Sequence, residues 1–490
     1  MSFKVKIATV IVLCASLSGA ASLAQEPGEH GALGERLDQL LIEQMTVSQA
    51  AEEGLRLFTT PFNKIDGYGD GPLDPVDTVD PGGRPTLQGN GTLLRINGLD
   101  AQACFECHTL VSNATIPATL GVGGAGGSNS NAIIMPSEAI DVADLIDLDG
   151  EAGFNGRFAN PPFMFGVGGV ELVGLEMTAE LQALKAQAIA SPGTPVALVA
   201  KGVEFGSITA DTFGSVDTSL VEGVDDDLVI RPFGRKGEFA TTRDFDLGAM
   251  RFHFGMEPVE EVGENIDHDG DGVINEITVG EISALSVFLS TLRRPEQDRL
   301  DAEGVQGEAL FATMGCSDCH MPALDTETKN LPLRFPQVAT SPFENIYKAV
   351  DLTRPPMRFP RNSDGGVRVQ MFSDLKRHDM GDGLAEDFAL MTPEQNREFI
   401  TAKLWGVADS GPWLHDGRAL TISDAILAHG GEAQSARDQF EGLAAADRES
   451  VLSFLRALRT PSPEPARNNP RVIRSLGNDA ASGAHTINRR

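Results

Sequence analysis

Two copies of the pattern Cys-X-X-Cys-His, at residues 104–108 and 316–320, carry the clearest chemistry in this chain. At this spacing two thiols bond the vinyl groups of one haem, and the adjacent imidazole ligates its iron. The chain is therefore predicted to carry two covalent c-type haems. The predicted attachment and iron-binding residues are Cys104, Cys107 and His108 in the first copy and Cys316, Cys319 and His320 in the second.

Two other chemistries use paired cysteines. A redox-active dithiol has no need of the trailing histidine that both copies carry, so this alternative is disfavoured. A zinc site built from all four cysteines is chemically allowed, but it also leaves the two histidines without a role. Covalent haem is the interpretation that uses every residue of both motifs.

The first 24 residues have the layout of a cleavable secretory signal. Lys4 and Lys6 precede an apolar run from residue 7 to residue 17, and small residues follow. The run is too short to span a bilayer. We expect a soluble protein exported to the periplasm or an equivalent compartment, without a membrane span once the signal is removed.

The composition is strongly acidic, with a formal net charge of -31 at pH 7. Such a surface argues against binding to nucleic acid or to anionic membranes. It favours a partner with a lysine-rich face, such as a small cytochrome c or a cupredoxin that donates electrons. Acidity also serves solubility in exported proteins, which is the alternative reason for the same charge.

An internal repeat divides the chain. Gly-X-X-Leu-Phe precedes both haem motifs, at residues 54–58 and 307–311, and each helical pattern that ends a unit stops at a proline, Pro295 or Pro461. The order of helix, haem motif, loops and closing helix is similar to the cytochrome c fold. We expect a mainly α protein with two cytochrome c-like haem domains, the first enlarged by long loops. The predicted organisation is a signal peptide at 1–24, an enlarged N-terminal haem domain at 25–300, a C-terminal cytochrome c domain at 301–465 and a tail at 466–490.

A calcium-type loop at residues 267–278 lies between the two units. Oxygen-bearing side chains occupy positions one, three, five and nine, and a glycine occupies position six, as in calcium loops. The predicted ligands are Asp267, Asp269, Asp271 and Asn275. Because position twelve is Thr278 rather than a glutamate, Glu276 or Glu281 would have to complete the shell. An Asp-rich turn without an ion remains the alternative.

The order of these features resembles the family of dihaem oxidoreductases and peroxidases related to bacterial dihaem cytochrome c peroxidases and MauG-type enzymes. Besides the haem motifs, the resemblance rests on the segments Asn160–Glu171, Phe252–Met256, His378–Gly381 and Pro412–Ala419. It implies one haem iron with two protein ligands that accepts electrons, and a second iron with an open face where hydrogen peroxide reacts. The distal ligands would then decide function.

For the second haem, Met380 is the favoured distal ligand. It follows His320 by an interval similar to that in single-haem cytochromes c and lies in a glycine-containing loop. A thioether ligand would raise the reduction potential, whereas His378, the competing candidate, would lower it. His415 and His429 are further candidates that sequence does not rank.

For the first haem, His253 and Met256 are the nearest distal candidates, since aromatic residues flank both. If that iron is instead open, peroxide needs a nearby group that moves a proton between its two oxygens. Glu171 matches a position of the family segment and is the predicted catalytic residue. Neither tyrosine, Tyr68 or Tyr347, matches the tyrosine iron ligand of MauG-type enzymes.

The leading hypothesis is a periplasmic dihaem peroxidase-type oxidoreductase, in which electrons enter at the C-terminal haem and hydrogen peroxide is reduced at the other. An electron-transfer cytochrome with two closed irons is one alternative. An oxygen-dependent dihaem oxygenase acting on an organic substrate is another.

Overall fold

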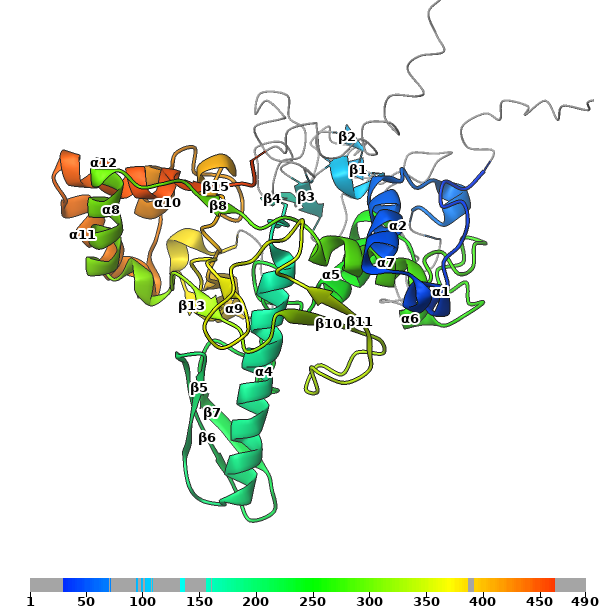
Figure 1. Cartoon of the computed structure of the whole chain (residues 1–490), viewed down its shortest axis with the longest axis horizontal. Helices are drawn as coiled ribbons and strands as arrows, with labels where there is room; N and C mark the ends of the chain where they lie inside the picture. Colours follow the sequence, from blue (N-terminus) through cyan, green and yellow to red (C-terminus); the bar gives the residue numbers. More distant parts are fainter. Residues whose placement is uncertain are drawn as a thin grey trace, which may run out of the picture.

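The computed structural model describes residues 30–69, 71, 94–95, 98–99, 102–106, 108, 133–136, 156–159, 161–386 and 392–462. The predicted signal segment 1–24, Cys107, Asn160 and the tail 466–490 lie outside the described residues. Within the described part, two helix pairs stand at opposite ends of the molecule, and the long helix α4 (Val167–Ala190) runs between them (Figure 1).

The first helix pair consists of α2 (Val47–Thr59) and α7 (Val279–Ser290). Gly54 marks the crossing: a Cβ at this position would collide with the carbonyl oxygen of Ala284 in α7. One turn later Phe58 lies against Phe288, with ring centroids 5.3 Å apart. The glycine therefore permits the close approach, and the phenylalanine fills the space beside it.

The second pair, α8 (Ala302–Thr313) and α12 (Ala445–Arg456), repeats this arrangement. A Cβ on Gly307 would collide with the carbonyl oxygen of Ser450. Phe311 lies 5.4 Å from Phe454, centroid to centroid. The repeated Gly-X-X-Leu-Phe pattern of the sequence thus marks the same helix crossing at both ends of the molecule.

Side-chain caps begin three of these four helices. Thr46 and Thr278 each form a capping box, with Gln49 in α2 and with Glu281 in α7. Asp301 accepts a hydrogen bond from the Gly304 amide at the start of α8. Such caps satisfy backbone N–H groups that the first helical turn leaves without a partner.

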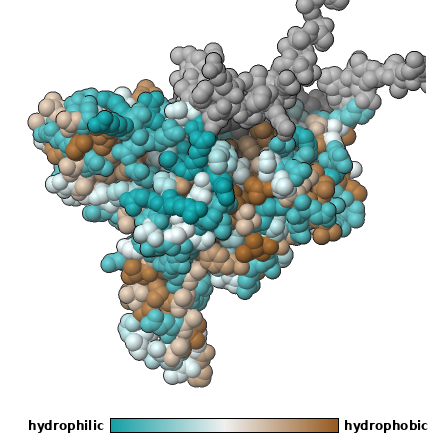
Figure 2. Space-filling model, viewed as in Figure 1, coloured by the Kyte–Doolittle hydropathy of each residue, from teal (hydrophilic) through white to brown (hydrophobic). Residues whose placement is uncertain are grey.

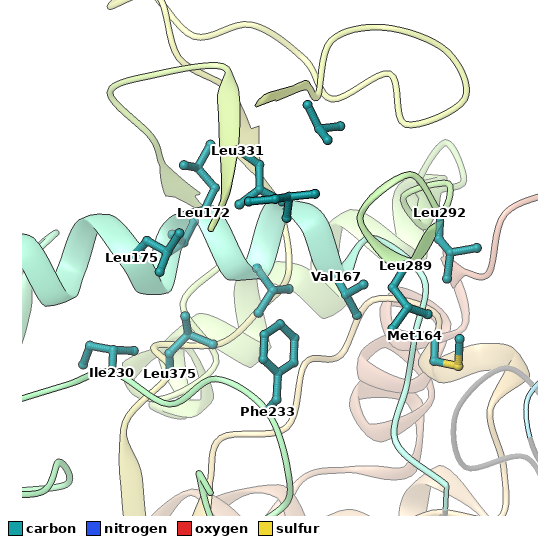
Figure 3. Packing of buried hydrophobic residues seen from close by; sticks show 14 of the residues in the cluster. Met164, Val167, Leu172, Leu175, Ile230, Phe233, Leu289, Leu292, Leu331 and Leu375 are labelled. Atoms are coloured by element: carbon teal, nitrogen blue, oxygen red, sulfur yellow. The ribbon is translucent and has the colours of Figure 1, made fainter. Parts of the chain in front are cut away.

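Helix α4 organises the larger hydrophobic core. Its first half is buried on every side, and Val167, Leu172 and Leu175 pack among residues from distant segments, including Leu331 and Leu375 (Figure 3). Burial of such side chains is worth about 1.5–3 kcal/mol each. The crowded start of α4 therefore joins the N-terminal and C-terminal parts of the chain.

The second half of α4 extends into an arm with a three-stranded antiparallel sheet of order β5-β6-β7 (Figure 1). The strands are β5 (Val196–Ala200), β6 (Val203–Ala210) and β7 (Val216–Val221). Figure 2 shows hydrophobic residues on this arm, where Phe213 and Leu220 are 95% and 67% exposed. The sequence analysis expected loops in the first unit and did not anticipate this sheet.

Short two-stranded pairings fix the remaining segments. All of them are antiparallel: β1 (Leu94–Arg95) with β2 (Gly98–Leu99), β3 (Ile133–Pro136) with β4 (Gly156–Ala159), β8 (Glu296–Gln297) with β15 (Leu458–Arg459), β9 (Leu324–Asp325) with β12 (Arg368–Val369), β10 (Asn330–Arg334) with β11 (Ile346–Asp351), and β13 (Arg377–Asp379) with β14 (Glu398–Ile400). The expectation of a mainly α protein therefore holds only in part, because strands build much of the middle of the molecule.

Short helices complete the described part of the chain. They are α1 (Gln39–Gln44), η1 (Lys64–Asp66), η2 (Cys104–Glu106), α5 (Thr242–Ala249), η5 (Met250–Phe254), α6 (Val259–Val262), η6 (Cys316–Asp318), η7 (Asp382–Leu384), α9 (Pro393–Arg397), η8 (Val407–Asp409), α10 (Ile422–Leu427), η9 (Gly431–Ala433) and α11 (Gln434–Gly442). A smaller hydrophobic cluster centred on Phe311, Phe440 and Phe454 forms a core of its own beneath α8, α11 and α12. Among the described helices, none is both long and apolar enough to cross a membrane.

The helix crossing makes a direct prediction. Gly307→Ala should lower the free energy of unfolding by roughly 1–3 kcal/mol, because the added methyl group meets backbone that no rotamer change can move. Thermal unfolding of the purified protein measures this effect. Gly442→Ala, in α11 where a Cβ meets open space, is the matched control and should leave the melting temperature nearly unchanged. Equal effects in the two variants would contradict the close crossing.

Candidate haem-iron and cation sites

The first haem motif lies beside the first helix pair. Cys104 begins the short turn η2, and the His108 amide donates to the Cys104 carbonyl oxygen at 3.2 Å. The His108 ring lies 6.3 Å from the ring of Phe58 in α2. The phenylalanine of the repeated pattern thus contacts the predicted iron-binding imidazole.

The second motif repeats these relations closely. The His320 amide donates to the Cys316 carbonyl oxygen at 3.0 Å, and the His320 ring lies 6.3 Å from Phe311. Nδ1 of His320 is hydrogen-bonded to the Phe372 carbonyl oxygen at 3.1 Å. Because this carbonyl accepts, Nδ1 carries the proton and Nε2 keeps the lone pair that binds metal.

The electrostatic environment suits both imidazoles to iron. Burial, with a smaller effect of His253, lowers the pKa of His108 to about 3. Burial, followed by the effect of His429, lowers the pKa of His320 to about 4. Both rings are therefore neutral at pH 7, as a metal ligand must be. His108 Nδ1 is buried without a hydrogen-bond partner among the described residues, and Cys316 and Cys319 are free thiols. These residues fit the haem that the motifs predict.

His378, one of the two predicted distal ligands, has both ring nitrogens engaged. Nε2 lies 2.9 Å from Asp374 Oδ2, and Nδ1 lies 2.7 Å from Glu432 Oε2. Burial would lower its pKa, but the bonds with Asp374 and the contact with Cys319 outweigh burial and raise it to about 11. A thioether bond at Cys319 would remove the effect of its thiol on the pKa of His378. The carboxylates of Asp374 and Glu432 would remain as partners of the ring. Both ring nitrogens of His378 are therefore engaged by carboxylates.

The other predicted ligand, Met380, follows in the same segment. Its amide donates to the Arg397 carbonyl oxygen at 3.0 Å, and its own carbonyl oxygen lies beside Gly430. The loop that carries Met380 therefore packs on the segment that carries His429.

His429 is a distal candidate that the sequence analysis named without ranking it. Its ring centroid lies 6.4 Å from that of His320, and the two ring planes are inclined by 55°. Its Nδ1 is hydrogen-bonded to the Ala425 carbonyl oxygen at 2.8 Å, at the end of α10. The sequence signal available was only a histidine just beyond a helix, and its position opposite His320 depends on tertiary structure.

The candidates around the first motif come from neighbouring elements. His253 lies in the π-helical turn η5 between Phe252 and Phe254, whose rings lie 4.8 Å and 6.4 Å from the His253 ring, centroid to centroid. Such turns are frequent at functional sites. Met256 is fully buried within the larger hydrophobic core.

Glu171 is buried in the first half of α4. It accepts hydrogen bonds from the Thr242 amide at 3.0 Å and from the Thr242 hydroxyl at 2.8 Å. Burial raises its pKa to about 7, against the opposing effect of these two bonds. Thr242 begins α5, the helix that runs into the η5 turn with His253. Glu171 is thus a carboxyl group that can both take and give a proton near neutral pH.

His415 lies in a separate polar cluster. Its ring is stacked 4.7 Å from Phe399, and its Nε2 lies 3.6 Å from Glu386 Oε2. Arg418 pairs with Asp416 and donates to the Gly383 carbonyl oxygen at 3.0 Å. These contacts join loops of the C-terminal part.

The predicted calcium loop has a different ligand arrangement from the one expected. Asp267, Asp269 and Asp271 do come together, with one oxygen of each within 4.8 Å of the others. Asn275 instead turns to Asn265, to which it is bonded through both its amide atoms. Glu281 is paired with Arg36 at 2.7 Å and caps α7.

A second, buried carboxylate group shares Asp269. Glu257, Asp269 and Glu276 also present one oxygen each within 4.8 Å, and they are 6%, 3% and 1% exposed. Burial, with the neighbouring carboxylates, raises the pKa of Glu276 to about 10 and that of Asp269 to about 6. Glu276 Oε1 has no hydrogen-bond partner among the described residues. Sequence analysis did not single out Glu257, which precedes the loop.

Comparison with known proteins bears on the C-terminal part of the chain. Residues 362–458 match the family described as "Di-haem oxidoreductase, putative peroxidase". The resemblance to dihaem oxidoreductases that the motifs indicated is therefore confirmed. A search of curated proteins found no match.

Two solved structures show distant likeness. Hydrazine synthase from Kuenenia stuttgartiensis, solved under 20 bar xenon, is 17% identical over 37% of this chain, with a TM-score of 0.21. The matched region covers 55% of the synthase chain, which is about half of its length. A MauG-like protein associated with microbial copper homeostasis is 14% identical over 54% of this chain and 80% of its own, with a TM-score of 0.27. Scores this low carry no argument about function.

Proposed function

We propose that this protein is an exported dihaem c-type oxidoreductase that reduces hydrogen peroxide, with electrons entering at the C-terminal haem. The observation that carries the proposal is the duplicated site: a histidine of a Cys-X-X-Cys-His motif packs on a helix phenylalanine at 6.3 Å in both halves. The family match at residues 362–458 supports the oxidoreductase class. The predicted signal segment supports export to the periplasm.

Haem iron, when bound, supplies electrons and an open coordination position for peroxide. The chain must supply protons, because reduction of hydrogen peroxide to two waters consumes two electrons and two protons. Glu171 would accept the proton of the inner peroxide oxygen and return it to the outer oxygen as the O–O bond breaks. A second proton arrives from solvent. With a pKa of about 7, Glu171 is suited to both halves of this transfer.

The electron donor follows from the charge. With 70 acidic against 39 basic residues, the protein attracts a basic redox partner and repels an acidic one. Figure 2 shows mainly hydrophilic residues over the end of the molecule that carries α8 and α12. A small cytochrome c or a cupredoxin with a lysine-rich face is the donor we propose.

One alternative has a specific observation behind it. His253 lies in the η5 turn between Phe252 and Phe254, and the first iron would be closed if this histidine were its second ligand. The protein would then transfer electrons without reducing peroxide. Carbon monoxide binding to the reduced protein separates the two functions, because an open iron binds the gas and two closed irons do not.

Peroxide reduction should depend on Glu171. Stopped-flow mixing of reduced protein with hydrogen peroxide should show rapid reoxidation, rising with pH to a plateau above about 7, because protonated Glu171 cannot accept a proton. Glu171→Gln should lower this rate roughly 10²-fold or more and remove the ionisation near pH 7.

Glu176→Gln is the matched control for this experiment. It changes another buried carboxylate of α4, which instead pairs with Lys201 at 2.7 Å, and should keep the pH profile. Reoxidation no faster than that of an ordinary cytochrome c would reject peroxide reduction. An unchanged pH profile in Glu171→Gln would reject the role of Glu171.

We also propose that a calcium ion binds the buried carboxylates Glu257, Asp269 and Glu276. Three buried carboxylates so close together are costly unless a cation compensates them. Among the described residues, the basic side chain beside them is His268, which lies 3.8 Å from Glu257 Oε1 and is itself half exposed. Calcium accepts about six to eight oxygen ligands, including carboxylates and backbone carbonyls. The Gly71 amide donates to Asp269 at 2.8 Å, so the ion would connect the loop to the segment that follows η1. Its role would be to brace the first unit.

Calcium should stabilise the protein through Glu276. After treatment with a chelator, calcium at 100 times its dissociation constant should add about 2.7 kcal/mol to the free energy of unfolding. Glu276→Gln should abolish this gain. Asp267→Asn should retain most of it, because Asp267 is exposed and its oxygens accept the Gly270 and Gly272 amides. The reverse ranking of the two variants would place the ion in the outer aspartate group, and no effect of calcium on either would reject the site.

A further inference from the structure

We propose that His429 is the second axial ligand of the C-terminal haem iron, opposite His320. The inference rests on the proposed dihaem function and specifies one of its two centres. It concerns a residue for which the sequence offered no ranking.

The separation of the two rings is the first argument. An imidazole nitrogen lies about 2.0 Å from a bound metal, and about 1.2 Å from its own ring centre, so two imidazoles on opposite sides of one metal hold their centroids roughly 6.3 Å apart. The measured separation between His320 and His429 is 6.4 Å. The pair is thus spaced for an intervening ion.

The hydrogen bonds of the two rings are the second argument. Each Nδ1 is bonded to a backbone carbonyl oxygen, that of Phe372 for His320 and that of Ala425 for His429. Histidines that bind metal usually donate their other ring N–H to such an acceptor, which fixes the tautomer. Both rings therefore present Nε2 as the free base. The two histidines come from separate segments of the chain, and each offers Nε2 as a metal ligand.

His378 and Met380 are the other two candidates for the second ligand of this iron. His378 has both nitrogens clamped by Asp374 and Glu432, so iron binding would require breaking a buried ion pair. Met380 is adjacent to Gly430 through its backbone, so its loop supports the position of His429. His429 is the candidate that is already opposite His320.

A bis-histidine iron has consequences for the rest of the protein. It is closed to peroxide, so reduction must occur at the His108 haem. It also has a lower reduction potential than an iron with a methionine ligand. The C-terminal haem then serves as the electron-transfer centre, in agreement with electron entry at that end.

The test uses the purified full-length holoprotein in the ferric state. Near-infrared magnetic circular dichroism should show a bis-histidine low-spin haem and no band typical of methionine ligation. His429→Ala should convert one haem equivalent to high-spin in electron paramagnetic resonance, and added imidazole should restore the low-spin signal. Met380→Leu and His378→Gln should both keep the bis-histidine spectrum of the C-terminal haem.

The outcomes separate the two proposals. A methionine-type band in the wild-type protein that Met380→Leu removes would overturn the assignment to His429, and this spectrum is informative even if the His429→Ala variant does not fold. Persistence of the low-spin signal in His429→Ala would overturn it as well. Peroxide-driven reoxidation of the wild type is measured separately, so its failure rejects the proposed activity without altering the ligand assignment.

Discussion

The contact between two helices at a glycine is the constraint on which both predicted haem sites depend. Gly54 and Gly307 let the first helix of each unit meet the backbone of the closing helix, and the phenylalanine one turn later then reaches both the closing helix and the motif histidine. A larger residue at the crossing would separate the helices and remove the phenylalanine from the imidazole. The same local geometry therefore fixes packing and ligand position together, and its duplication explains why the two ends of the molecule resemble each other.

Burial shifts the pKa of several titratable side chains in this protein. Burial keeps His108 and His320 neutral and raises the pKa of Glu171 to about 7, whereas the hydrogen bond with Asp374 raises the pKa of His378. The direction of each pKa shift depends on whether burial acts alone or is opposed by a charged partner. At the buried carboxylate group, burial together with neighbouring carboxylates raises the pKa of Glu276 to about 10 and that of Asp269 to about 6.

Sequence alone predicted the features that repeat or have fixed spacing. The two haem motifs, the Gly-X-X-Leu-Phe pattern and the helices that end before Pro295 and Pro461 are all local in sequence. The 6.4 Å separation between the His429 and His320 rings depends on how α10 packs, and the buried carboxylate group includes Glu257, which lies ten positions before the loop. The sheet β5-β6-β7 was missed because its short alternating strands follow a long helix in a part of the chain that resembled loops.

The central claim is that both motifs carry covalently attached haem. Intact mass spectrometry of the exported protein under denaturing conditions tests it most directly, because thioether bonds survive unfolding whereas axial ligation does not. The account predicts a single species with the mass of the processed chain plus two haem groups. A chain that retains one haem or none after denaturation would contradict it.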